Sequence, residues 1–415
     1  MSRLNELIQE LCSDGVEFKR LGDLGVFENI GVDKKIIQGQ SLVTLLNYVD
    51  VYKNMYIDNS IPKMIVSASI NKIHNCSCEK GDIFITPTSE TKNDIGHASV
   101  IRETLINTVY SYHIMRFRLI EVNMTSSFFI RYLFETEFVK KQIYKLSKGL
   151  TRFGLSKYDF AKIEIPYPPL DVQNEIVSIL DTFTSHTAEL QAELQARKEQ
   201  YEYYRNKLLT FDKDDKNVKW MKLGEVGSFI RGNGLQKKDF TESGVGCIHY
   251  GQIYTYYGTS ANKTKSFVAH ELANKLVKVK KGNLIIACTS ENIEDVCKAV
   301  VWLGEDDIVT GGHSCVFVHN ENPKYISYFF QTDFFSQQKR KYARGTKVID
   351  IKTSDLEKII IPILPYTEQQ RIVSILDKFE ALVNDLTEGI PAEIAAVQEQ
   401  YEYYRNKLLT FKQRA

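Results

Sequence analysis

Apolar side chains recur at helical spacing in two long segments of the chain, residues 171–216 and 367–415. Steps of three and four residues separate them, except that Arg197 interrupts the first stripe between Leu194 and Tyr201. This spacing predicts an amphipathic helix with an apolar stripe in each segment. The stripes follow the a and d positions of a heptad repeat, a spacing that favours packing of one helix on another. They consist of Leu190, Leu194, Tyr201, Tyr204 and Leu208 in the first segment, and of Ile390, Ile394, Val397, Tyr401, Tyr404 and Leu408 in the second.

Two matching stripes in one chain predict two long helices that pair as an intramolecular coiled coil. The alternative is that each helix packs on the globular part of its own half. Gly389 and Pro391 predict an interruption of the second helix just before its stripe. Tyrosine is bulky for the seam between two helices, so we expect some of these side chains to dock a partner protein. The candidate docking residues are Tyr201, Tyr204, Arg205, Tyr401, Tyr404 and Arg405.

The blocks between the helical segments, residues 17–170 and 217–366, show short apolar runs of strand length separated by turn residues. Each block is predicted to be an α+β globular domain. A short helix is expected within residues 1–16, before the first block. In the second block we expect strands within 247–257, 276–288 and 315–319, one helix over 324–343, a glycine turn at 344–346 and a strand over 359–364.

The second half of the chain repeats the first. Residues 199–211 and 399–411 both read EQYEYYRNKLLTF, thirteen identical residues 200 positions apart. That period is far longer than the ~20–50 residues of stacked repeat proteins, so a whole domain with its helix has been duplicated. Similarity is high in the helical segments and low in the blocks, which predicts one shared scaffold with two different surfaces. Other matching segments are 21–25 with 223–227, 88–90 with 289–291, and 176–181 with 372–377.

The composition is that of an ordinary globular protein. The chain has 415 residues, 43% of them hydrophobic and 25% charged, and such a length suits about two or three domains. No window approaches about 18 consecutive apolar residues, and the first residues lack the pattern of a secretory signal, so we expect a cytoplasmic protein without a membrane span. The seven cysteines are scattered, as is typical of a reducing compartment.

Charged residues are distributed unevenly, although the net charge is only +1. Residues 17–170 carry 20 Lys and Arg against 16 Asp and Glu, and residues 217–366 carry 20 against 15. The remaining, largely helical segments are correspondingly acidic. Two mildly basic blocks are compatible with contacts to phosphates, whereas the low net charge argues against non-specific coating of nucleic acid.

Both blocks contain residues suited to contacts with DNA. Residues 231–238, RGNGLQKK, form a basic loop in which glycine permits close approach of the backbone. The segment 249–254, predicted as a strand, adds tyrosines and a glutamine, which can form paired hydrogen bonds with adenine. Residues 339–341, KRK, add charge. The candidates are Lys34, Lys35, Tyr48, Asp50, Lys53, Ser89, Lys148 and Arg152 in the first block, and Arg231, Asn233, Lys237, Lys238, Tyr250, Gln252, Tyr254, Ser290, Arg344 and Lys347 in the second.

Motifs of catalysis are not evident in the sequence. A DNA amino-methyltransferase needs an Asn/Asp-Pro-Pro-aromatic loop, which residues 166–169 and 322–325 resemble only superficially. A dinucleotide site needs a three-glycine loop between a strand and a helix, and residues 232–234 supply two glycines. The cluster of His74, Cys76 and Cys78 lacks a second ligand pair at zinc-like spacing. We therefore expect no catalytic residue and no metal site.

The helical ends and the opening of the chain resemble the specificity subunit of a type I restriction–modification enzyme. The alignment of the two halves covers nearly the whole chain, and the helical motifs are the specific part of the resemblance. Ser13 stands where that family commonly has proline. The resemblance rests on residues 192–198 (AELQARK) leading into 200–205 (QYEYYR), on 389–394 (GIPAEI) leading into 401–405 (YEYYR), and on 11–18 (LCSDGVEF).

The resemblance implies an α+β fold in which two target recognition domains are separated by two long antiparallel helices, with a pseudo-twofold repeat. It implies no catalysis and no cofactor in this subunit. The implied partners are double-stranded DNA, two modification (methyltransferase) subunits and two restriction (motor and nuclease) subunits, which would use S-adenosylmethionine, ATP and magnesium in a prokaryotic cytoplasm. The implied segments are 1–16 (N-terminal helix), 17–170 (first recognition domain), 171–216 (central conserved helices), 217–366 (second recognition domain) and 367–415 (C-terminal conserved helices).

The geometry of DNA gives such an arrangement a physical reason. Equivalent sites recur on one face of DNA about every 34 Å, and the 24 residues from 187 to 210 form about 36 Å of helix. The helices would then hold two different reading domains about one turn apart, on a bipartite and asymmetric target. Two alternatives remain, namely a scaffold that binds only proteins and a stand-alone DNA methyltransferase or nuclease.

Overall fold

The computed structural model describes residues 2–385 and 387–414, and their contacts divide the chain into two compact units. Unit 1 comprises residues 1–189 with 394–415, and unit 2 comprises residues 190–393. The boundaries fall inside long helices. Each unit therefore contains one globular domain, the beginning of the helix that follows it, and the end of the helix that belongs to the other half of the chain.

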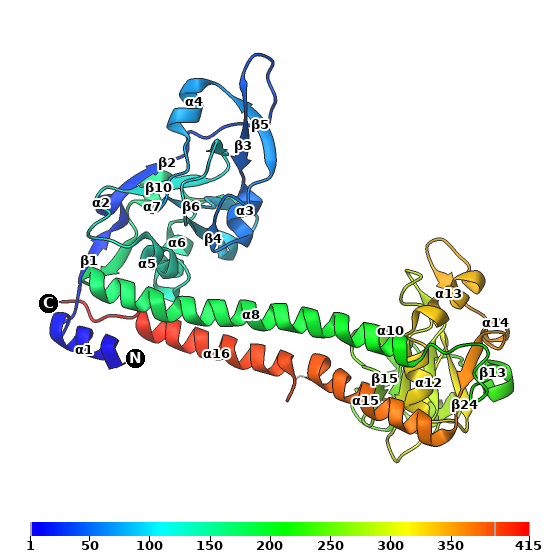
Figure 1. The fold of residues 1–415 in the computed structure, drawn as a ribbon. Coiled ribbons are helices and arrows are strands. Elements are labelled where there is room, and N and C mark those ends of the chain that lie inside the picture. The colour runs from blue at the N-terminus through cyan, green and yellow to red at the C-terminus, as the bar shows by residue number, and fades with distance from the viewer. Residues whose placement is uncertain (1, 386, 415) are drawn as a thin grey trace. The chain divides into compact units, whose positions relative to one another are not determined.

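Unit 1 is built on a five-stranded sheet in the order β2-β10-β6-β8-β4 and a three-stranded sheet in the order β5-β3-β9 (Figure 1). Two small sheets, β1-β12 and β11-β7, complete it. Its strands are β1 (Glu17–Arg20), β2 (Gly25–Glu28), β3 (Ser41–Leu46), β4 (Tyr56–Ile57), β5 (Met64–Ala68), β6 (Ile83–Ile85), β7 (Thr88–Ser89), β8 (Ala98–Ile101), β9 (Thr108–Tyr110), β10 (Met115–Leu119), β11 (Phe153–Gly154) and β12 (Glu164–Tyr167), and its helices are α1 (Ser2–Leu11), α2 (Leu21–Leu24), α3 (Tyr48–Lys53), α4 (Ile70–Asn75), η1 (Lys92–Asp94), α5 (Ser127–Leu133), α6 (Glu137–Leu146), α7 (Lys157–Phe160) and the first part of α8 (Leu170–Leu208).

Unit 2 repeats this plan with two five-stranded sheets, in the orders β14-β24-β20-β22-β17 and β15-β18-β16-β23-β19, and the small sheets β13-β26 and β21-β25. Its strands are β13 (Lys219–Lys222), β14 (Gly227–Arg231), β15 (Phe240–Thr241), β16 (Val245–Ile248), β17 (Ser260–Ala261), β18 (Ser266–Val268), β19 (Val277–Val279), β20 (Leu284–Ala287), β21 (Thr289–Ser290), β22 (Ala299–Trp302), β23 (Ile308–Thr310), β24 (Ser314–His319), β25 (Ile349–Asp350) and β26 (Ile360–Ile363), and its helices are α9 (Leu223–Val226), η2 (Lys237–Asp239), α10 (Tyr250–Thr255), α11 (His270–Ala273), α12 (Pro323–Phe329), α13 (Asp333–Tyr342), α14 (Thr353–Leu356) and α15 (Tyr366–Asn384).

The central strand of each large sheet is buried on both faces. In β6, Ile83 and Ile85 join the core that contains the helices, whereas Phe84 joins the core beneath the second sheet. The alternation follows from the period of two in a strand. In unit 2, Leu284 and its neighbours alternate in the same way between two cores. The duplicated α+β architecture expected from the sequence is thus confirmed.

Two expectations about local structure in the second block are wrong. The segment after Ile248 is the helix α10 rather than a strand, because His249 caps it by accepting a hydrogen bond from the backbone N–H of Gly251. The single helix expected over 324–343 is two helices, α12 and α13. Thr332 separates them, since its hydroxyl accepts a hydrogen bond from the backbone N–H of Phe335 and starts the second helix.

The long helices pair within one chain, as predicted, but in each unit the end of one helix packs on the beginning of the other. In unit 1, Tyr404 of α16 (Ile390–Leu408) stacks on Phe183 of α8, with ring centroids 5.5 Å apart. In unit 2, Tyr201 and Tyr204 of α8 stack on Phe379 of α15. The second helical segment is interrupted between α15 and α16, where Gly389 and Pro391 predict it. The sequence predicts the pairing of helices but not which parts of them meet.

A buried glutamine fixes the start of each long helix on its domain. Gln173 of α8 donates to the carbonyl of Pro168 (2.8 Å) and accepts from the backbone N–H of Ser126 (2.8 Å). Gln369 of α15 repeats this pattern, with Leu364 and Asn322 as its backbone partners. Both side chains are fully buried. Buried amides need partners, so this pair of bonds defines how the helix leaves the domain.

A repeated aspartate fixes the same helices two turns further along. Asp181 accepts hydrogen bonds from the hydroxyls of Tyr132 (2.6 Å) and Tyr56. In unit 2, Asp377 accepts from Tyr328 (2.6 Å) and from the ammonium group of Lys324 (2.9 Å). Asp181 and Asp377 are the last residues of the matching segments 176–181 and 372–377. The similarity of these two segments therefore reflects an equivalent contact of each helix with its domain.

We expect Gln173→Ala to lower the free energy of unfolding of unit 1 by about 2 kcal/mol, because two buried backbone groups lose their partners. Urea unfolding followed by circular dichroism measures the change. Gln191→Ala, at an exposed position of the same helix, is the matched control and should shift stability by less than about 0.5 kcal/mol. Equal effects of the two substitutions would contradict the anchor.

Candidate nucleic-acid interface

A closed glycine loop gathers several of the expected DNA contacts in unit 1. Lys148 and Gly154 exchange two backbone hydrogen bonds, 3.0 and 2.9 Å long, across the loop. Gly149 has a φ of +134°, and a Cβ there would lie 1.9 Å from the carbonyl oxygen of Arg152. Only glycine therefore permits this backbone. The loop leads into β11, which pairs with β7 and places Phe153 opposite Ser89.

The side chains around β7 converge on Thr88. The guanidinium of Arg152 donates to the Thr88 hydroxyl (3.3 Å), and the hydroxyl of Tyr48 donates to the Thr88 carbonyl (3.1 Å). Lys148 is exposed and lies 4.0 Å from the carboxylate of Asp159. The structure thus brings together four residues that the sequence singled out: Tyr48, Ser89, Lys148 and Arg152.

Unit 2 contains a loop of the same construction. Arg344 and Asp350 exchange backbone hydrogen bonds of 3.1 and 2.8 Å. Gly345 has a φ of +113°, and a Cβ there would lie 2.0 Å from the carbonyl oxygen of Val348. The loop leads into β25, which pairs with β21 at Thr289 and Ser290.

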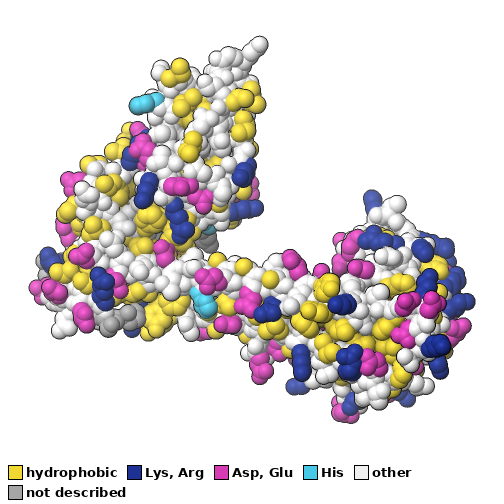
Figure 2. Space-filling view, viewed as in Figure 1, with side chains coloured by type: hydrophobic (Ala, Val, Ile, Leu, Met, Phe, Trp, Pro, Cys, Tyr) yellow, Lys and Arg dark blue, Asp and Glu magenta, His cyan; other side chains and the backbone are white. Residues whose placement is uncertain are grey.

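The surroundings of this second loop repeat the first with other side chains. Arg231 forms an ion pair with Asp350 (3.3 Å), and the hydroxyl of Tyr254 donates to the carbonyl of Thr289 (2.7 Å). Lys347 is exposed at the loop tip. On the face drawn in Figure 2, Lys and Arg side chains gather on the side of unit 2 that carries α13 and α14. The residues brought together here are Arg231, Tyr254, Ser290, Arg344 and Lys347.

Two expected base-reading side chains serve as helix caps instead. The carboxylate of Asp50 accepts the backbone N–H of Asn47 at the start of α3, and burial raises its pKa above the usual range. The amide of Gln252 accepts the backbone N–H of His249 (3.0 Å) and donates to the hydroxyl of Ser266 (2.7 Å). Because both ends of this amide are engaged, the paired bonds to adenine expected from the sequence are not available in this arrangement.

The basic loop 231–238 is attached to the domain at its centre. Leu235 is buried in a small core and has a φ of +49°. The carbonyl of Gly234 accepts the backbone N–H of Gly312 at 3.1 Å. Asn233, Lys237 and Lys238 remain exposed on either side of this anchor.

Other expected cations divide into exposed and buried ones. Lys34, Lys35 and Lys53 are exposed in unit 1, and Lys35 pairs with Asp33 at 2.7 Å. Among the expected aromatic contacts, Tyr250 is half-buried, and its ring packs beside those of His249 and His313. Lys339 is buried instead, and its ammonium group donates to the backbone carbonyls of Glu294 (2.7 Å) and Val296 (2.8 Å). Lys339 therefore ties α13 to the segment that contains Glu294 and Val296 and is not available to contact a phosphate.

The candidate docking residues on the two identical helix ends face inward. In unit 1, Glu135 accepts the hydroxyl of Tyr401 (2.8 Å) and the guanidinium of Arg405 (3.3 Å). In unit 2, the corresponding acceptor is Gln331, which receives the guanidinium of Arg205 at 3.3 Å. With the aromatic stacking of Tyr201, Tyr204 and Tyr404, all six side chains hold the helix ends on the units themselves.

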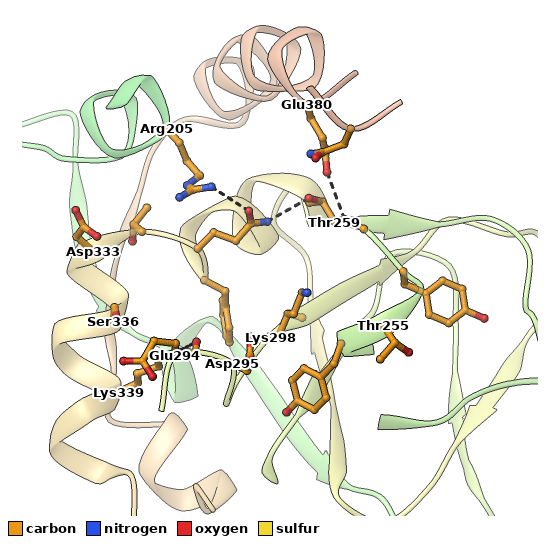
Figure 3. Close-up of a pocket in the computed structure, with 18 of the residues that line it drawn as sticks. Arg205, Thr255, Thr259, Glu294, Asp295, Lys298, Asp333, Ser336, Lys339 and Glu380 are labelled. Atoms are coloured by element: carbon orange, nitrogen blue, oxygen red, sulfur yellow. Dashed lines mark hydrogen bonds between the residues drawn. The ribbon is translucent and has the colours of Figure 1, made fainter. Parts of the chain in front are cut away.

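The Gln331 contact lies in a polar cavity of about 640 Å³ in unit 2 (Figure 3). The amide oxygen of Gln331 accepts from Arg205, and its amide nitrogen donates to the Thr259 hydroxyl (3.2 Å). The Glu380 carboxylate accepts the backbone N–H of Thr259 (3.3 Å). These polar groups bond to one another across the cavity, so they join the helix end, α15 and the domain.

Within the described part of the chain, no cluster of three or more histidine, cysteine, aspartate and glutamate side chains has the proximity of a metal site. None of the described helices is both long and apolar enough to cross a membrane.

Comparison with known proteins identifies the class to which this duplicated architecture belongs. The family model "Type I restriction modification DNA specificity domain" matches twice, over residues 13–200 and 215–396. The chain therefore belongs to that family. It is a DNA sequence-recognition subunit of a type I restriction–modification system, the non-catalytic part of such an enzyme, as the resemblance implied.

Its relatives have the same description. A putative type I restriction enzyme specificity subunit of Haemophilus influenzae, S.HindORF215P, is 34% identical over 275 residues, which are 63% of this chain and 68% of the relative. The EcoR124I/EcoR124II specificity subunit of Escherichia coli is 35% identical over 272 residues, 63% of this chain and 66% of the relative.

Solved structures share the fold at low sequence identity. A chain from a study of complex assembly and conformational transition of the type I R-M system covers 95% of this chain and 97% of its own length, with a TM-score of 0.61 and 16% identity. The S subunit from M. genitalium gives a TM-score of 0.52 at 14% identity, over 95% of this chain and 96% of its own.

The contacts of Glu135 predict that docking of the helix end 399–411 depends on pH. Burial raises the pKa of this carboxyl, but Arg131, the Tyr401 hydroxyl and Arg405 together lower it below its usual range. A depressed carboxyl pKa stabilises the folded state above the pKa of the unfolded chain, and this stabilisation is lost as pH falls through the folded value. We expect hydrogen-exchange protection of 399–411 to fall between about pH 5 and 3.

The identical segment 199–211 is the internal control, because its hydrogen-bond acceptor Gln331 is neutral and its intrinsic exchange rates are the same. Glu380 lies in the same cavity, where it accepts from Thr259 and Tyr328. Peptides that extend into the differing flanks distinguish the two copies by mass. Glu135→Gln should remove the difference in pH dependence, and Gln331→Glu should introduce it in unit 2. Equal protection of both segments over the whole pH range in the wild-type protein would contradict this role of Glu135.

Proposed function

We propose that the two domains, within residues 17–170 and 217–366, each read one half of a bipartite, asymmetric DNA target. One observation carries this proposal: the two units share the strand order of one five-stranded sheet and the same closed glycine loop, yet the loops carry different side chains. A common frame supports contacts with the common phosphate backbone, whereas different surface side chains favour different bases. The long helical segments would set the unread gap between the half-sites.

The proposed DNA contacts are all the candidate residues except the two helix caps, Asp50 and Gln252. Arg and Lys suit phosphates or the acceptor edge of guanine, and exposed amide and hydroxyl groups suit base edges. Asp50 and Gln252 act in this proposal through the helices that they cap. The contacting set is Lys34, Lys35, Tyr48, Lys53, Ser89, Lys148 and Arg152 in unit 1, and Arg231, Asn233, Lys237, Lys238, Tyr250, Tyr254, Ser290, Arg344 and Lys347 in unit 2.

The proposed partners are two modification subunits, one at each identical helix end, and two restriction subunits. The cofactors S-adenosylmethionine, ATP and magnesium would belong to these partners, and the complex would work in a prokaryotic cytoplasm. Since Tyr201, Tyr204, Tyr401 and their arginine neighbours face inward, docking falls to the outward side of the helix ends. Tyr203 and Tyr403 are 59% and 60% exposed there, and the residues on either side of them are identical in the two segments.

A methylation map tests the reading function. We expect DNA from cells that carry this chain with its cognate modification subunit to show a gapped, asymmetric motif that is absent from cells without it. Replacing residues 217–366 by the corresponding block of another specificity subunit should change one half of the motif and leave the other half intact. A change in both halves, or in neither, would contradict one domain per half-site.

Binding of the modification subunit tests the docking surface. We expect Tyr203→Ala and Tyr403→Ala each to weaken one of two binding events by about 2 kcal/mol, as is usual for a tyrosine anchor. Calorimetric titration of the modification subunit measures both events. Tyr158→Ala, at a tyrosine of unit 1 that is 69% exposed, is the control and should leave both events unchanged. Unchanged affinity in the double variant would move the docking surface elsewhere.

A further inference from the structure

The two closed glycine loops, residues 148–154 and 344–350, present the same three kinds of side chain in a different order. After Gly149 come an apolar residue, a hydroxyl and a cation: Leu150, Thr151 and Arg152. After Gly345 come a hydroxyl, a cation and an apolar residue: Thr346, Lys347 and Val348. The frame beneath is the same in both loops, since equivalent hydrogen bonds close them and the glycine Cβ position is blocked by the carbonyl three residues later.

The apolar side chain in each loop, Leu150 or Val348, is exposed to solvent. Leu150 is 94% exposed and Val348 is 59% exposed. One exposed aliphatic side chain needs no explanation. Here, however, the exposed aliphatic residue recurs on the equivalent loop of both units, on a backbone closed by two hydrogen bonds. A cation is the adjacent residue in unit 2 and lies two residues away in unit 1. Folding does not require this arrangement, because neither side chain adds to a core.

Such a loop suits the reading of bases in DNA. Apolar side chains discriminate bases by contact with the methyl group of thymine, while Lys and Arg discriminate guanine by its two acceptors. A rigid loop holds these groups at fixed positions along the base pairs, so that a different order of side chains selects a different order of bases. Hydrogen-bonded backbone on either side keeps the spacing constant.

We infer that these two loops are the paired base-reading elements of the protein, and that their tips, residues 150–152 and 346–348, determine specificity. Leu150 would contact a thymine methyl group in the half-site of unit 1. Lys347 would contact guanine acceptors in the half-site of unit 2, one loop position further along. This inference rests on the proposed function, because it assigns to two loops the reading that the domains perform.

Exchange of the tips tests the inference. One variant carries L150T, T151K and R152V, and the reciprocal variant carries T346L, K347T and V348R; both keep the glycines and the closing hydrogen bonds. Each is expressed with the modification subunit, and genomic methylation is mapped. We expect each exchange to change the accepted bases at one or two adjacent positions of one half-site, with the other half and the gap unchanged.

The single variant Leu150→Ala keeps the test informative if an exchange variant fails to fold. Methylation by the complex with this variant is compared on oligonucleotides that differ only at the contacted position. The preference for thymine at that position should fall about ten-fold relative to the wild-type protein. Ile106→Ala, at an aliphatic residue of unit 1 that is 78% exposed outside the loop, is the control and should leave the preference unchanged.

Two outcomes would overturn the inference. The first is a wild-type motif in both exchange variants together with undiminished base preference in Leu150→Ala. The second is an equal loss of methylation at all sites by folded variants, since this indicates a backbone contact without base reading. If replacement of the whole block 217–366 changes the motif while the loop exchanges do not, only the loop assignment fails. If the wild-type complex methylates no gapped motif, the proposed function itself fails.

Discussion

The structure depends on a buried polar anchor at the start of each long helix. The amide of Gln173 or Gln369 satisfies one backbone donor and one backbone acceptor where neither can reach water, and Asp181 or Asp377 collects tyrosine hydroxyls two turns later. Each unmade bond would cost about 1–3 kcal/mol. A helix held at two such points leaves its domain in one direction only.

The identical helix ends show that one segment can serve two different binding surfaces. Residues 399–411 bind unit 1 through the carboxylate of Glu135, and residues 199–211 bind unit 2 through the amide of Gln331. Aromatic stacking on Phe183 or Phe379 is common to both. Since the tyrosines and the arginine at three positions of each segment face inward, the repeated sequence is explained first by the fold. Its outward residues, Tyr203 and Tyr403 among them, remain exposed.

The two loops proposed to read DNA follow the opposite rule. Their backbone is the same in both units, because glycine at 149 and 345 is sterically required, whereas the side chains on the tips differ. A specificity subunit needs this combination. Contacts that position the protein on DNA are the same for every sequence, and contacts that choose a sequence must differ between half-sites.

The sequence by itself determined the duplication, the α+β class, the interruption of the second helix and the family, because these depend on identity and on periodicity along the chain. It also selected Lys148, Arg152, Arg231 and Arg344, which the fold brings to the two loops. Only the tertiary structure decided that Gln252 and Asp50 are caps, that Lys339 is buried, and that the tyrosine stripes pack on the beginnings of the helices. The reason is physical: a polar side chain has the same chemistry in a sequence whether its partner is DNA or a backbone group, and the partner is chosen by contacts between residues far apart in the chain.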